Sequence, residues 1–187
     1  MGVDAPEQAD AWSLMQAEKY GEARAVLIRR LRKKPESHWL LTRVGTTYYE
    51  EKRYEKALKY HEKAMKLAPK CPLVLWDYAG TLAMLGRREE AITIWQGLIR
   101  RGVRSIAHGE CGEGTRHARS LVNDSRYSMG KAYAEMGRTD LARRYMRQYI
   151  ANRGPNCSSI YNLHKVKREL REIEGRGAAC SAAKDGP

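Results

Sequence analysis

Residues 38–71 read HWLLTRVGTTYYEEKRYEKALKYHEKAMKLAPKC. Apolar residues recur every three or four positions on both sides of a polar turn, which predicts two amphipathic helices joined by that turn. Pro69 ends the second helix, because proline lacks the amide hydrogen that a helix interior needs. Gly45 and Ala57 are small enough to let the two helices approach closely. The stretch therefore predicts a helical hairpin.

The same arrangement recurs at a fixed interval along the chain. Ala23, Ala57 and Ala91 stand 34 residues apart, and so do Pro35 and Pro69. One hairpin of this length cannot bury its apolar face alone and must stack on a neighbouring hairpin. The period therefore predicts repeated helix-turn-helix units, which we number one to four in chain order: about 4–37, 38–71, 72–105 and 123–156.

Repeat two has the signature of a known family in the expected order: Leu41, Val44, Gly45, Tyr48, Ala57, His61 and Pro69. On these residues most of the chain resembles the tetratricopeptide repeat family. The resemblance implies an all-α, right-handed α-solenoid of about four units, with the first helices of the units lining a concave groove. It also implies a role in protein–protein interaction, since members of this family usually hold an extended peptide or a partner helix.

Two segments depart from the period. Residues 104–115 are rich in glycine and are predicted to form an insert loop, after which the first helix of repeat four starts early, near Arg116. Helical spacing resumes at Ser158 and predicts a capping helix over about 158–174. Residues 175–187 are small and polar, and we expect a disordered tail there, beyond a repeat domain that ends at residue 174.

By the resemblance, one stripe of the first helices faces the groove. It contains aromatic and polar side chains of the kind that anchor a bound segment. The predicted partner-binding residues are Trp39, Thr42, Arg43, Thr46, Tyr49, Trp76, Asp77, Gly80, Tyr127 and Lys131. The alternative is that the aromatic side chains pack between neighbouring helices, which is the commoner fate of tryptophan at helical spacing.

The net charge of +13 favours acidic partners, and nucleic acid is one of them. Arginines and tyrosines alternate in repeat four, a combination that can grip single-stranded RNA or DNA through phosphates and base stacking. The residues concerned are Arg116, Arg119, Arg126, Arg138, Arg143, Arg144, Arg147, Tyr127, Tyr145 and Tyr149. Cations that merely complement helix ends explain much of the excess as well, so nucleic-acid binding is the alternative function.

Catalysis is not predicted, because the sequence contains no legible nucleophile triad, carboxylate pair or phosphate-binding loop. His108, Cys111 and His117 in the insert could ligate zinc or form a thiol–imidazole pair. Their H-x2-C-x5-H spacing lacks a second ligand pair, so an ordinary surface loop is the preferred interpretation. We therefore expect no catalytic residue, no metal and no cofactor.

The four cysteines are scattered, which predicts free thiols in a reducing compartment. No apolar stretch has the length of a signal-peptide core or a membrane span, so a cytoplasmic protein without a membrane contact is expected. The predicted function is a non-enzymatic adaptor, chaperone or scaffold that binds a protein or peptide, as a monomer or a homodimer.

Overall fold

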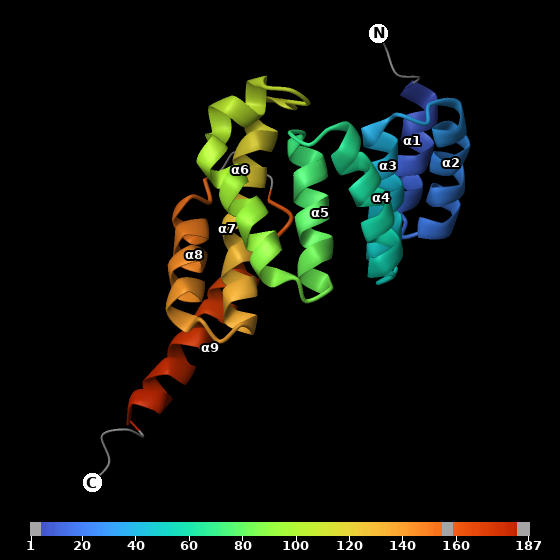
Figure 1. The fold of residues 1–187 in the computed structure, drawn as a ribbon. Coiled ribbons are helices and arrows are strands. Elements are labelled where there is room, and N and C mark those ends of the chain that lie inside the picture. Colours follow the sequence, from blue (N-terminus) through green and yellow to red (C-terminus); the bar gives the residue numbers. More distant parts are fainter. Residues whose placement is uncertain (1–4, 155–158, 183–187) are drawn as a thin grey trace. The chain divides into compact units, whose positions relative to one another are not determined.

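The computed structural model describes residues 5–154 and 159–182, and within these residues the secondary structure is helical (Figure 1). The helices are α1 (Ala5–Gln16), α2 (Tyr20–Lys33), α3 (His38–Glu50), α4 (Tyr54–Leu67), α5 (Pro72–Met84), α6 (Arg88–His108), α7 (Gly114–Glu135), α8 (Thr139–Ala151) and α9 (Leu163–Ala182). Helices α2, α4 and α6 begin at intervals of 34 residues, the period of the sequence.

The chain divides into two compact units, unit 1 (Met1–Arg88) and unit 2 (Glu89–Pro187). In unit 1, α1 packs on α2 and α3 packs on α4, and each pair contacts the next helix of the chain. The core around the first of these junctions contains Ala11, Leu27, Leu40 and Val44. These apolar residues lie at helical spacing in the sequence, so stacking buries the apolar stripe that a single hairpin would leave exposed.

Local signals set the helix boundaries in unit 1. The Ser37 side chain accepts a hydrogen bond from the Leu40 amide at 3.3 Å and so caps the start of α3. Pro72 occupies the first turn of α5, where its missing amide hydrogen has no cost. The turns after α3 and α5 contain left-handed residues, Lys52 with φ 60° and Gly86 with φ 82°.

The predicted insert loop at 104–115 is wrong for most of its length. Helix α6 is interrupted at Gly102, whose φ of 72° and ψ of 166° are not helical, and then resumes as far as His108. Ile106 and Ala107 are buried in this second part, and their burial stabilises helix where the nearby glycines favour loop. Only residues 109–113 connect α6 to α7, and α7 starts early, as expected.

The C-terminal predictions need two corrections. Helix α9 begins at Leu163 rather than near Ser158, because the Asn162 side chain caps it by accepting hydrogen bonds from the amides of His164 and Lys165. It continues to Ala182, so residues 175–182 are helical rather than disordered, in keeping with the high helix propensity of their alanines. The remaining predictions at 155–158 and 183–187 lie outside the described residues.

Cys71 is a free thiol, as predicted. Among the helices in the described part of the chain, none is both long and apolar enough to cross a membrane.

Candidate partner-binding face

Helices α3 and α5 bring together seven of the ten predicted partner-binding residues, all of them partly exposed: Trp39, Arg43, Thr46, Tyr49, Trp76, Asp77 and Gly80. The two helices meet where Thr46 Oγ1 lies 3.3 Å from Asp77 Oδ2. A Cβ atom at Gly80 would lie 4.0 Å from the Tyr49 ring. The Arg43 guanidinium lies 5.7 Å from the centre of the Trp39 ring. These residues therefore form one surface, which we call the inner face of unit 1.

Thr42, the eighth predicted residue, is not part of that surface. Its side chain is fully buried, and its hydroxyl donates a hydrogen bond to the His38 carbonyl oxygen at 2.7 Å. The Thr42 carbonyl oxygen in turn lies 3.3 Å from His61 Nε2. Thr42 thus belongs to the packing beneath the inner face.

The sequence interpretation missed two residues of the inner face, Trp12 on α1 and Met84 at the end of α5. Both are large and apolar, yet Trp12 is 55% exposed and Met84 is 50% exposed. The 34-residue register could have found Trp12, which is equivalent to the predicted residue Thr46. Met84 is equivalent to Glu50, which was not predicted, so the register does not identify it. We include Trp12, Glu50 and Met84 in the inner face. The face so defined combines two half-exposed apolar side chains with half-buried aromatic ones, a composition typical of surfaces that bind a partner.

Acidic groups gather at one end of the inner face. Glu50 is exposed at its surface, but partial desolvation by its neighbours raises its pKa, and the nearby carboxylates of Asp77 and Glu18 raise it further. Glu50 is one helical turn beyond Thr46, the residue that contacts Asp77. In the part of the chain that the structure describes, no ion pair neutralises Glu18, Glu50 or Asp77. This end of the face is therefore acidic, although the whole chain is basic.

His61 lies directly beneath the inner face and is 1% exposed. Its Nδ1 is 2.9 Å from Thr81 Oγ1, so the ring bridges α4 to both α3 and α5. Burial lowers the pKa of His61 from its ordinary value of 6.5. The Asp77 carboxylate and the Thr42 carbonyl oppose this change, and the Arg43 charge adds to it.

This burial predicts that unit 1 loses stability in acid. The unfolded chain takes up a proton at His61 near pH 6.5, whereas the folded chain does so only at lower pH. The free energy of unfolding should therefore be independent of this group above pH 6.5 and fall as the pH drops from 6.5 toward the lower folded pKa. Urea titrations at several pH values should show the decline in the wild type. A His61→Gln variant should show less of it, and equal declines in both proteins would contradict the assignment.

In unit 2, one of the two predicted partner-binding residues is buried. Tyr127 on α7 is 1% exposed, with its ring centre 5.6 Å from that of Tyr149 and 4.3 Å from that of Tyr161. Its hydroxyl donates a hydrogen bond to Glu169 Oε2 on α9 at 2.6 Å. Lys131, the tenth predicted residue, stays exposed one turn further along. At Tyr127 the packing alternative applies, because the chain's own C-terminal segment covers the position.

A buried polar network attaches that covering segment to α7 and α8. The Ile160 amide donates a hydrogen bond to Asp124 Oδ2 at 3.2 Å, and the Tyr149 hydroxyl donates one to the Tyr161 carbonyl oxygen at 3.0 Å. The hydroxyls of Ser128 and Tyr161 lie 3.1 Å apart. Burial raises the pKa of the Asp124 carboxyl, and its hydrogen bonds to Ser159 and Ile160 limit the rise. These contacts fix residues 159–161 against α7.

The nucleic-acid alternative loses much of its predicted surface. Tyr127 and Tyr149 are buried, so neither ring is available for base stacking. Tyr145 stacks on Tyr133 instead. Several arginines of repeat four have intramolecular partners: Arg143 pairs with Asp140, and Arg147 with Glu174. What is left is a basic surface on which only Tyr145, of the three predicted rings, is partly exposed.

The histidines and the cysteine of the connecting segment do not form a cluster. His108 ends α6, Cys111 lies in the 109–113 connection, and His117 lies on α7 with its Nδ1 3.5 Å from Glu113 Oε2. Among the described residues, no group of three metal-ligating side chains contains His108 or His117.

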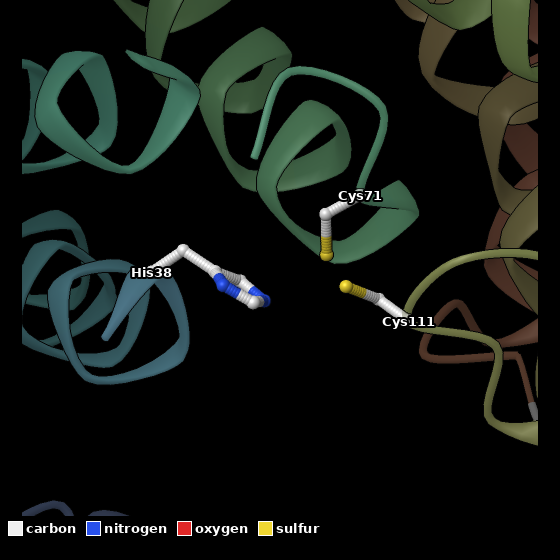
Figure 2. A group of neighbouring side chains, drawn as sticks. All are labelled: His38, Cys71 and Cys111. Atoms are coloured by element: carbon white, nitrogen blue, oxygen red, sulfur yellow. The ribbon is translucent and has the colours of Figure 1, made fainter. Parts of the chain in front are cut away.

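Unit 1 contains a thiol–imidazole pair that the sequence did not indicate. His38 begins α3, and Cys71 immediately precedes α5. Figure 2 shows the two side chains directed toward one another, with their ligand atoms within 4.8 Å. Two donors from one unit are fewer than a zinc site requires, so the pair does not by itself define a metal centre.

Comparison with family models identifies the family of this chain. Tetratricopeptide repeat models match residues 9–69, 48–107 and 124–153. A search of curated proteins finds no significant match. Together the three family matches include all four repeats in whole or in part, and they confirm the predicted resemblance.

Solved structures show the same fold at low sequence identity. MamA from Desulfovibrio magneticus RS-1 is 13% identical over 100% of this chain and 99% of its own, with a TM-score of 0.63. The Sgt2 TPR domain from Aspergillus fumigatus is 17% identical over 80% and 85%, with a TM-score of 0.57. BtubC (BKLC) from P. vanneervenii is 14% identical over 95% and 79%, with a TM-score of 0.62. These likenesses confirm the all-α solenoid class.

Proposed function

Because this chain belongs to the tetratricopeptide repeat family, we propose that it is a non-enzymatic adaptor, chaperone or scaffold that binds a partner protein on the inner face of unit 1. Repeats of this family are protein-interaction modules, and their first helices provide the binding surface. Preformed helices bind with little ordering cost to the receptor, so an extended segment or a helix of the partner is the fitting ligand.

One observation supports the inner face of unit 1 above the rest of the surface. Trp12 and Met84 expose about half of their surface on the first helices of repeats one and three. Between them in the chain lie the half-buried rings of Trp39, Tyr49 and Trp76. Exposed apolar side chains beside rigid aromatic ones are typical of binding hot spots. In unit 2, Tyr127 occupies the position equivalent to Trp76, and residues of α9 already cover it.

Blocking the inner face should remove partner binding without unfolding the protein. Gly80 is suited to this test, since an added Cβ atom there meets only the Tyr49 ring within 4 Å, at ordinary contact distance. We expect Gly80→Arg to reduce recovery of partners in a pull-down from the native host by about tenfold or more. The stability should not fall, because replacing a helical glycine favours the helix.

The matched control is Gly97→Arg on α6, where an added Cβ atom has no neighbour within 4 Å. This variant has the same new charge and the same gain in helix propensity, and it should recover the same partners as the wild type. Unchanged recovery by Gly80→Arg would move the interaction away from the inner face. Circular dichroism of both variants verifies that they are folded.

A further inference from the structure

The acidic end of the inner face indicates what kind of partner it accepts. Glu50 is exposed and Asp77 is half-buried on the same surface as the half-exposed Trp12 and Met84. Glu18 adds a third carboxylate from the turn between α1 and α2. The one inner-face cation is Arg43, nearly two helical turns from Glu50 and directed at the Trp39 ring. The charge of this end is therefore negative, and no ion pair compensates it among the described residues of unit 1.

We infer that the inner face of unit 1 recognises a basic segment, with a lysine or arginine of the partner beside Glu50 and Asp77 and an apolar side chain of the same segment on Trp12 or Met84. This inference rests on the proposed function, because it assigns a ligand chemistry to the same face. It runs against the charge of the whole chain, which by itself favours acidic partners.

The physical basis is that uncompensated carboxylates favour an incoming cation. Partial desolvation and the neighbouring carboxylates both make the ionised form of Glu50 less favourable than in water. A cation from a partner would relieve the repulsion between Glu50, Asp77 and Glu18, whereas an acidic segment would increase it. The apolar contacts supply affinity, and the carboxylates select the sign of the partner's charge.

The experiment uses the full chain and two synthetic probe peptides. One is a short fluorescent peptide of leucine, alanine and lysine, and the other has glutamate in place of every lysine. In fluorescence anisotropy at low salt, the lysine peptide should bind at least about tenfold more tightly than the glutamate peptide. Its affinity should fall as salt increases, because screening weakens the attraction. Equal affinities for the two peptides would overturn the inference.

Substitutions then locate the charge selection. Glu50→Gln with Asp77→Asn should weaken lysine-peptide binding by about tenfold, since both changes remove charge and keep shape. The matched control, Glu36→Gln with Glu62→Gln, removes the same charge from exposed positions of unit 1 outside the inner face and should change affinity by less than about twofold. Glu50→Lys should shift the preference toward the glutamate peptide, a result that misfolding cannot produce.

Two outcomes separate this inference from the proposed function. If Gly80→Arg abolishes partner recovery but the charge-neutral pair Glu50→Gln and Asp77→Asn does not, the inner face binds a partner and the basic preference is wrong. The Glu50→Gln, Asp77→Asn variant could instead lose self-association in analytical ultracentrifugation and keep its peptide binding. The inner face would then bind a second copy of this basic chain, and the inference of a separate basic segment would be overturned.

Discussion

Replacing Gly45 with alanine is expected to destabilise unit 1 by about 3 kcal/mol, because the core has no room for the added methyl group. An ideal Cβ at Gly45 would lie 2.3 Å from both Cδ2 and Nε2 of the His61 ring. The ring cannot easily withdraw, since it is buried between Thr42 and Thr81 and close to a polar atom of each. Urea denaturation followed by circular dichroism measures the loss.

A double-mutant cycle tests the cause of this loss. In a His61→Ala background the methyl group of Gly45→Ala has space, so the two changes together should cost less than the sum of their separate costs. Strict additivity would mean that the close approach of Gly45 to His61 is not what limits this position. Gly80→Ala is the control for helix propensity alone, and it should stabilise the protein slightly.

Replacing Tyr127 with alanine is expected to destabilise unit 2 by about 3–5 kcal/mol, the usual cost of removing a buried aromatic ring. The ring packs against Tyr149 and Tyr161 and lies in one cluster with Val166 and Leu170 of α9. Its loss would separate α9 from the hairpin of α7 and α8. Thermal and urea denaturation should both show the effect.

Tyr127→Phe separates the ring from its hydroxyl. This variant keeps the packing and loses only the hydrogen bond to Glu169, so it should cost about 1–2 kcal/mol. If Tyr127→Ala instead left stability unchanged and abolished partner binding, Tyr127 would be a partner contact, as the sequence first indicated. The two variants therefore show whether Tyr127 packs in the core of unit 2 or contacts a partner.

The hairpins were predictable from local signals in the sequence. The interval between equivalent alanines, the turn after Glu50 and the proline at the start of α5 are properties of short stretches, and each fixes a helix boundary without help from distant residues. The same local reasoning failed at 104–108 and at 175–182. In the first segment, burial of Ile106 and Ala107 outweighs neighbouring glycines. In the second, alanines extend α9 through two further glycines.

The candidate site was predictable only in part. The family register identified the half-buried residues on α3 and α5, and the same register, applied to repeat one, would have found Trp12. The sequence could not show that Thr42 faces inward, since the orientation of a threonine at the edge of a stripe depends on how the helices pack. Nor could it show that Glu50 and Asp77 form no ion pair with any residue that the structure describes.

The sequence by itself determined that this protein is a series of stacked helical hairpins, because period and turn chemistry act over a few residues. Only the tertiary structure decided which of the repeats present an open face. Tyr127 is closed off by Glu169, 42 residues away in the chain, while Trp12 and Met84 remain exposed. Contacts over such separations depend on the packing of whole helices, and no local pattern specifies them.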